Sequence, residues 1–166
     1  MTRPVVVLVG PPGAGKTTVG MLLAERLAVP FRDTDADVEA VAGKSVADIF
    51  YDDGEDAFRA LERTAVARAL EEHEGVLSLG GGAVLSPETR ARLAGEQVVF
   101  LNVGLADAAK RVGLSRDRPV LALNPRAALH VLLAERLPLY REVASVEVQT
   151  DGRTPEEVAR ESQAAL

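Results

Sequence analysis

The sequence Gly10-Pro11-Pro12-Gly13-Ala14-Gly15-Lys16-Thr17 follows an apolar run at residues 5–9 and precedes an amphipathic segment at residues 18–27. Glycines at this spacing let successive backbone N–H groups turn toward a phosphate chain, and the following helix directs its positive end at the same anion. Lys16 adds a positive charge near the terminal phosphates, and the Thr17 hydroxyl suits Mg²⁺. A simple glycine-rich turn is the alternative, but it requires neither a lysine nor a neighbouring hydroxyl. The stretch therefore predicts a phosphate-binding loop.

Composition limits the other classes of function. The 166 residues, 47% of them hydrophobic, suit one compact domain over residues 1–166. The net charge of −6 disfavours nucleic acid as a partner. There is no cysteine, and the two histidines, His73 and His130, show no metal-ligand spacing, so we expect both to be solvated helix positions. Without a signal peptide or an apolar stretch of membrane-spanning length, we expect a cytoplasmic protein that does not bind membranes. We also expect a monomer.

Short β-branched runs alternate with helical patterns, which is typical of a parallel α/β sheet. After residues 5–9, the predicted strands are residues 29–31, 76–79, 98–103 and 145–150. The first run is continuously apolar, so we expect it to lie centrally, covered on both faces. Residues 33–75 predict mostly helix, and residues 113–125 predict a long charged loop. Thr154 is a candidate N-cap for a last helix that begins at Pro155.

Two carboxylates follow the predicted second strand, where ligand sites of open α/β sheets collect. Along an extended segment, Asp33 and Asp35 would project to the same side, one toward a metal and the other toward a substrate hydroxyl. The alternative is that Asp35 caps a helix beginning near Ala36.

Three consecutive glycines and three arginines suit an anionic ligand. Gly80, Gly81 and Gly82 follow the strand at residues 76–79 and allow close approach to the backbone, although a mobile turn is the alternative. Arg59 lies one helical turn before Glu62, whose carboxylate can hold the guanidinium, although a surface ion pair is the alternative. The two other candidate arginines are Arg118, in the long loop that can close over a phosphate, and Arg136.

Taken together, these motifs resemble those of the shikimate kinase family, P-loop phosphotransferases similar to nucleoside monophosphate kinases. The resemblance spans nearly the whole chain and implies a three-layer α/β/α fold with a central five-stranded parallel sheet. It also implies a helical substrate-binding insertion at about residues 34–62 and a lid at about residues 112–125. It rests on six motifs in order: Gly10-x-x-Gly13-x-Gly15-Lys16-Thr17-Thr18-x-Gly20, Asp33-x-Asp35, Phe58-Arg59-x-x-Glu62, Gly80-Gly81-Gly82, Arg118-Pro119-Val120-Leu121 and Arg136-x-Pro138-Leu139-Tyr140.

The resemblance also implies a role for each candidate residue, with ATP and shikimate as substrates and Mg²⁺ as cofactor. The catalytic residues are Lys16, Asp35 and Arg118. The nucleotide is bound by Gly13, Ala14, Gly15, Lys16, Thr17, Thr18 and Arg118, with Arg111 and Pro155 flanking adenine. Shikimate is bound through its carboxylate by Arg59 and Arg136, and through its hydroxyls by Asp35 and the backbone of Gly80, Gly81 and Gly82. Mg²⁺ is ligated by Thr17 and, through water, by Asp33.

The implied reaction transfers the ATP γ-phosphoryl group to the 3-hydroxyl of shikimate, in aromatic amino-acid (chorismate) biosynthesis. A gluconate-type kinase is the nearest alternative, since only the acceptor site separates the two. A nucleoside monophosphate kinase is less favoured because Asp33 and Asp35 would face a phosphate-bearing acceptor. A non-catalytic nucleotide switch would lack the catalytic groups that this sequence carries.

Overall fold

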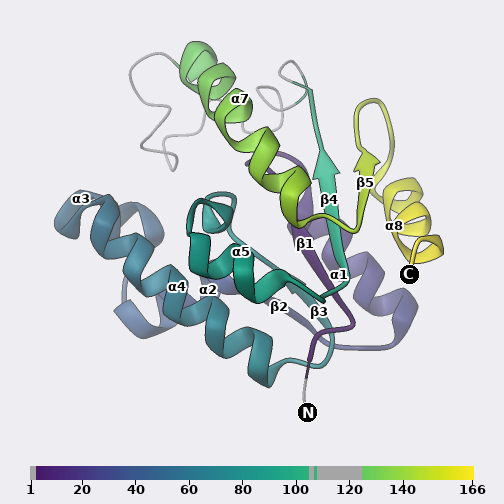
Figure 1. Cartoon of the computed structure of the whole chain (residues 1–166), viewed down its shortest axis with the longest axis horizontal. Coiled ribbons are helices and arrows are strands. Elements are labelled where there is room, and N and C mark those ends of the chain that lie inside the picture. Colours follow the sequence, from purple (N-terminus) through teal and green to yellow (C-terminus); the bar gives the residue numbers. More distant parts are fainter. Residues whose placement is uncertain (1–2, 105–106, 108–124) are drawn as a thin grey trace.

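Five parallel strands form one sheet in a computed structural model that describes residues 3–104, 107 and 125–166 (Figure 1). The strands are β1 (Val6–Val9), β2 (Phe31–Asp33), β3 (Val76–Ser78), β4 (Val98–Asn102) and β5 (Val146–Gln149). Their order is β2-β3-β1-β4-β5, and every neighbouring pair is parallel. The central position of β1 confirms the prediction made from its unbroken apolar run.

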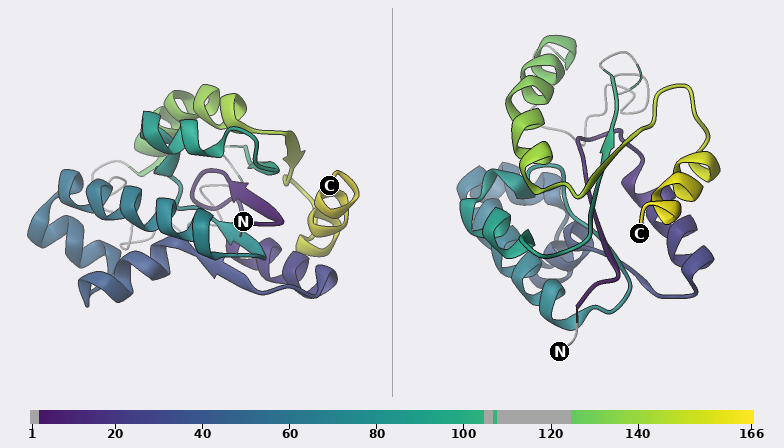
Figure 2. Two further views of the ribbon diagram at one scale, coloured as in Figure 1. Left: turned by 60° about the horizontal axis from the view of Figure 1, so that its bottom comes forward. Right: turned by 45° about the vertical axis from the view of Figure 1, so that its right-hand side comes forward.

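Helices cover both faces of the sheet (Figure 2). Those described are α1 (Lys16–Leu27), α2 (Thr34–Ala42), α3 (Val46–Asp53), α4 (Glu55–Glu72), the 3₁₀ turn η1 (Ala83–Leu85), α5 (Pro87–Leu93), α7 (Pro125–Val143) and α8 (Pro155–Ala164). Val6 and Leu8 of β1 pack into a core with α1 and α8, whereas Val7 and Val9 pack into a second core with α4, α5 and α7. The fold therefore has the three α/β/α layers that were predicted. None of the described helices is long and apolar enough to cross a membrane.

The helices between β2 and β3 form a smaller core of their own beside the sheet. Val38, Ile49, Phe58 and Ala65 are buried together, and the rings of Phe50 and Phe58 lie 4.9 Å apart. This packing holds α2 and α3 against the first turns of α4, in the segment predicted to be a helical insertion.

Local sequence explains where several elements begin. Thr154 caps α8 as predicted, because its hydroxyl accepts from the Glu157 N–H and the Glu157 carboxylate accepts from the Thr154 N–H. The prediction for β2 was displaced, since the strand begins at Phe31 instead of ending there. Pro30 has no N–H to donate to the ladder, and only its carbonyl reaches β3, where it accepts from the Val76 N–H.

One prediction about the histidines was wrong. His73 is buried, with 8% of its surface exposed, and its Nε2 lies 3.0 Å from the Val76 carbonyl oxygen. His73 is the C-cap residue of α4, where the chain turns toward β3. Its ring there supplies a polar partner for the carbonyl oxygen of Val76 in β3. His130 is exposed on α7, as predicted.

Candidate active site

The loop between β1 and α1 has the conformation that a phosphate-binding loop requires. Gly13 and Gly15 adopt φ angles of 83° and 89°, which residues with a Cβ rarely adopt. The Lys16 ammonium group donates to the carbonyl oxygens of Gly10 at 2.7 Å and Pro11 at 3.1 Å, so its side chain folds back over the loop. α1 begins at Lys16 and directs its N-terminal N–H groups into the same loop.

The sheet register brings Asp33 next to this loop. Asp33 pairs with Ser78 of β3, and Ser78 pairs in turn with Leu8 of β1, so the three strands end at one level. The Thr17 hydroxyl lies 3.4 Å from Asp33 Oδ2. This pair offers a hydroxyl and a carboxylate oxygen to a cation, which are the ligand types that Mg²⁺ prefers.

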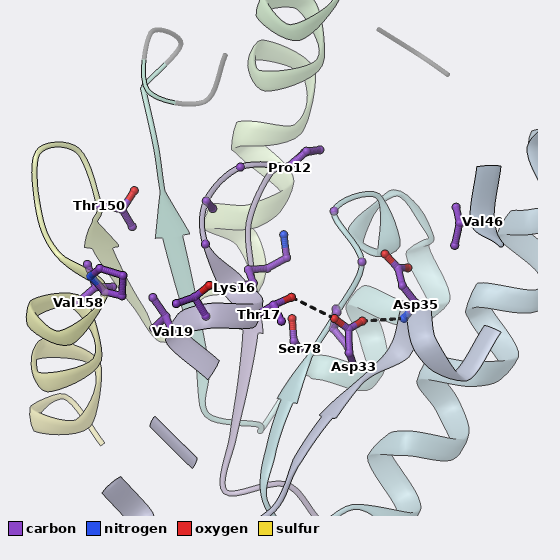
Figure 3. A pocket seen from close by; sticks show the side chains of 18 of the residues that line it. Pro12, Lys16, Thr17, Val19, Asp33, Asp35, Val46, Ser78, Thr150 and Val158 are labelled. Atoms are coloured by element: carbon purple, nitrogen blue, oxygen red, sulfur yellow. Dashed lines mark hydrogen bonds between the residues drawn. The ribbon is translucent and has the colours of Figure 1, made fainter. Parts of the chain in front are cut away.

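Asp35 lies near the same loop, but its backbone conformation differs from the one predicted. It lies in the first turn of α2, not in an extended segment, and its N–H donates to Asp33 Oδ1 at 2.9 Å. The N-cap of α2 is therefore Asp33, so the alternative in which Asp35 caps the helix is wrong. The helical turn leaves the Asp35 side chain directed toward the hollow beside the loop (Figure 3).

A cavity of about 920 Å³ runs along this edge of the sheet. Figure 3 shows Lys16, Thr17, Asp33 and Asp35 facing it. Eleven of the predicted site residues line it: Gly13, Ala14, Gly15, Lys16, Thr17, Thr18, Asp33, Asp35, Gly80, Gly81 and Pro155. Ser78 also lines the cavity, and the sequence analysis missed it. The available signal was that Ser78 is the one polar residue in the apolar run 76–79, directly before the triple glycine.

Each glycine of the triplet lies against a different charged side chain. A Cβ on Gly80 would collide with the Asp35 carboxylate and would lie 2.9 Å from Glu62 Oε2. One on Gly82 would lie 2.6 Å from the Arg59 Cζ, and one on Gly81 would lie 3.5 Å from Arg136 Nη1. Gly80 and Gly82 are therefore needed for the close approach of Asp35, Glu62 and Arg59, and the mobile-turn alternative is not sufficient for these two positions. At Gly81 the tightest neighbour of a Cβ would be Pro12 Cδ, at 3.1 Å.

Arg59 and Glu62 form the pair that the sequence predicted. Arg59 Nη1 donates to Glu62 Oε1 at 2.9 Å, and only 3% of the Glu62 side chain is exposed, so this is not a surface ion pair. Burial raises the pKa of the Glu62 carboxyl, and Asp35 adds to that rise, while Arg59 and Arg136 oppose it. The ring faces of Phe50 and Phe58 lie 5.9 and 5.2 Å from the guanidinium carbon. These contacts hold Arg59 against Gly82.

Arg136 approaches the triple glycine from the other side, on α7. It is buried, with 8% of its surface exposed, and no carboxylate of the described residues forms a salt bridge with it. A buried guanidinium without a carboxylate partner is costly unless an anion joins it. Neither Gly81 nor Gly82 donates its N–H to an acceptor in the described parts of the chain, whereas the Gly80 N–H donates to Thr34 Oγ1 at 3.2 Å. Two arginines and two N–H groups thus converge on one place.

Some predictions lie beyond what the structure describes. Arg111, Arg118 and most of the predicted lid at residues 112–125 lie outside the described residues, so only Pro155 represents the expected adenine contacts. Among the residues that are described, no group of three or more acidic or histidine side chains is arranged to hold a metal ion.

Known proteins are similar to this chain in sequence and in fold. The family model for shikimate kinase matches residues 12–166. A shikimate kinase from Saccharopolyspora erythraea is 66% identical over 154 residues, which are 92% of this chain and 88% of that protein. The structure of shikimate kinase from Acinetobacter baumannii in complex with shikimate has a TM-score of 0.91 at 36% identity, covering 97% of this chain and 90% of that one. A gluconokinase from Sinorhizobium meliloti, with a TM-score of 0.57 at 21% identity over 98% of this chain and 91% of its own, shares the fold alone. The chain belongs to the shikimate kinase family of ATP-dependent kinases.

Proposed function

We propose that this chain transfers the γ-phosphoryl group of ATP to the 3-hydroxyl of shikimate, with the residues above in the roles that follow. One observation carries the proposal: a phosphate-binding loop and a pair of arginines lie at the two sides of Asp35. That arrangement suits a donor with a phosphate tail and an acceptor with both a hydroxyl and a carboxylate.

The loop side binds the nucleotide. Backbone N–H groups of the loop enclose the phosphates, while that of Ala14 donates to the Pro11 carbonyl oxygen at 3.2 Å. Lys16 exchanges the carbonyl oxygens of Gly10 and Pro11 for phosphate oxygens. Thr17 would hold Mg²⁺ directly and Asp33 would hold it through water, and the ion would supply positive charge to the phosphates.

The glycine side binds the acceptor. Arg59 and Arg136 bind the carboxylate of shikimate, and the N–H groups of Gly81 and Gly82 add donors beside them. The Gly80 N–H is already used by Thr34, so Gly80 contributes by its lack of a side chain. Arg136, which forms no salt bridge with a carboxylate of the described residues, adds a positive charge that attracts an anionic acceptor despite the net charge of −6.

Asp35 then orients the acceptor hydroxyl toward the phosphoryl group. Because the transition state of phosphoryl transfer is loose, positioning and charge neutralisation supply most of the rate enhancement. Asp35→Asn separates orientation from proton removal. A fall in kcat of about 10² or more indicates that Asp35 accepts the proton, and a much smaller fall shows that it only orients the alcohol.

The decisive test is ADP production from ATP and Mg²⁺ with shikimate, with gluconate and with neither acceptor. We expect turnover with shikimate alone. Turnover with gluconate instead would favour the alternative kinase, and tight ATP binding with no acceptor-dependent ADP release would favour a nucleotide switch. Omitting Mg²⁺ tests the cofactor in the same assay.

A further inference from the structure

We propose that Tyr140 is a positioning residue that fixes the Gly81–Gly82 peptide against Arg136, so that both can bind the same acceptor carboxylate. This inference rests on the proposed function and names a residue that is not among those lining the cavity of about 920 Å³.

The first observation is a short hydrogen bond between distant parts of the chain. The Tyr140 hydroxyl donates to the Gly81 carbonyl oxygen at 2.6 Å, across 59 residues of sequence. In a trans peptide the C=O and N–H groups point in opposite directions, so holding the Gly81 carbonyl also fixes the direction of the Gly82 N–H. That N–H is one of the two that have no acceptor in the described parts of the chain.

The second observation is that Tyr140 itself is fixed. Its ring is buried, with 1% of its surface exposed, and stacks on Phe100 of β4 with ring centroids 5.0 Å apart. Tyr140 lies one helical turn after Arg136, so the hydroxyl and the guanidinium occupy the same face of α7. Tyr140 thus links α7, one turn away from Arg136, to the Gly81 carbonyl oxygen.

The third observation concerns the donor itself. Burial raises the pKa of the Tyr140 hydroxyl to about 12, although Arg136 opposes the rise. The hydroxyl therefore stays protonated at neutral pH, and it remains a donor to the Gly81 carbonyl oxygen.

Arg90 connects the turn that follows the glycines to a later part of α7. Arg90 of α5 donates to the carbonyl oxygens of Val84 at 2.7 Å and Leu85 at 3.2 Å, and its Nε lies 2.8 Å from Glu142 Oε2. Arg90 keeps the turn near α7 without touching the glycines. Loss of the Tyr140 hydroxyl should therefore loosen the Gly81–Gly82 peptide and leave the turn in place.

The test is Tyr140→Phe, which keeps the ring and its stacking. We expect the KM for shikimate to rise about tenfold, while kcat and the KM for ATP change less than twofold. Ser162→Ala is the matched control, because it removes another buried hydroxyl that donates to a backbone carbonyl, that of Val158 at 2.8 Å, in α8. Ser162→Ala should lower the Tm without raising the KM for shikimate.

A double-mutant cycle with Arg136→Lys separates positioning from a merely structural role. If Tyr140 acts through the carboxylate site, Tyr140→Phe should raise the shikimate KM less than threefold once Arg136 is replaced. A tenfold rise in both backgrounds, an unchanged KM, or equal rises in the KM for ATP and for shikimate would overturn the proposal. The stabilisation of Tm by saturating shikimate gives the same comparison for any variant with low yield. Failure of the wild type to use shikimate would overturn the proposed function as well, which distinguishes the two failures.

Discussion

The nucleotide side and the acceptor side of the proposed site are built in opposite ways. The nucleotide side is one continuous loop, residues 10–18, whose glycines, lysine and hydroxyl follow one another in the sequence. The acceptor side is assembled from separate segments, with Asp35 on α2, Arg59 and Glu62 on α4, the glycine triplet after β3, and Arg136 on α7. The loop depends on local conformation, whereas the acceptor side depends on how helices pack against the sheet.

Substitutions on the two sides should therefore act in different ways. On the nucleotide side, replacing the Lys16 or Thr17 side chain removes a ligand group, while the φ angles of Gly13 and Gly15 still shape the backbone of the loop. On the acceptor side, the groups hold one another, because Glu62 binds Arg59 and Arg59 lies over Gly82. A substitution there changes the position of groups that are not themselves replaced.

The largest effect is expected on the nucleotide side, from Lys16→Met. We expect kcat to fall on the order of 10³, since a charged group that stabilises the transferred phosphoryl group is lost. Shikimate affinity, measured by isothermal titration calorimetry, should stay within twofold, because the Lys16 ammonium group donates to carbonyl oxygens of the loop itself. A parallel loss of shikimate affinity would contradict the separation of the two sides.

Arg59→Met should produce the next largest effect, on the acceptor side. We expect the KM for shikimate to rise about 10², because a charge-assisted contact is lost and Glu62 remains buried without its cation. The matched control is Arg63→Met, since Arg63 is exposed on the same helix. Steady-state kinetics with each substrate varied in turn measures both, and equal KM values in the two variants would remove Arg59 from the site.

Gly82→Ala sharpens the comparison by adding a single methyl group. The new Cβ would displace the Arg59 guanidinium, whereas φ at Gly82 is −99°, which alanine tolerates. We expect a rise of about tenfold in the shikimate KM with little change in Tm.

Gly95→Ala is the contrasting variant for that prediction. Gly95 has a φ of 86° and no atom within 4 Å of the Cβ position, so the substitution strains the backbone far from the site. Its Tm should fall while the KM for shikimate stays constant. If both variants lose stability and neither changes KM, the close approach of Arg59 to Gly82 has no role in binding.

The smallest effect is expected outside both sides, at Glu147 of β5. Hydrogen bonding from Arg141 lowers the pKa of the Glu147 carboxyl below 4.5, with Asn102 and Gln149 also donating to it, although burial opposes the shift. A lowered pKa in the folded state contributes stability above pH 4.5, and this contribution disappears as the pH falls through the folded-state pKa. Glu147→Gln should lower the Tm by about 1–2 °C at pH 7 and by less at pH 3, with kinetics unchanged. A larger fall in Tm at pH 3 than at pH 7 would contradict a lowered pKa of Glu147 in the folded state.

Elements with strong local signals were predicted well. The alternation of β-branched runs with helical segments predicted the five strands, and the continuous apolarity of β1 predicted its central position. The cap of α8 followed from Thr154 and the residues after it. The errors arose where contacts with β3 decide the structure. Pairing with β3 begins at Phe31, after Pro30, so the predicted bounds of β2 were wrong. His73 is buried because its ring contacts the Val76 carbonyl oxygen of β3.

The candidate site divides in the same way. Residues 10–17 predicted the nucleotide side by themselves, because glycine conformations and the start of a helix are encoded within a few residues. Single arginines were ambiguous in the sequence, since an exposed ion pair and a buried anion site use the same residue types. Only packing distinguished them, by burying Glu62 beside Arg59 and leaving Arg136 without a carboxylate partner among the described residues.

The sequence by itself thus determined a phosphate-binding loop on a central parallel strand, because those features depend on neighbours in the chain. The tertiary structure alone decided that the glycine triplet lies between two guanidinium groups and that Tyr140 reaches Gly81. These contacts join residues far apart in the chain, and burial of apolar surface between the sheet and its helices supplies the free energy that brings them together.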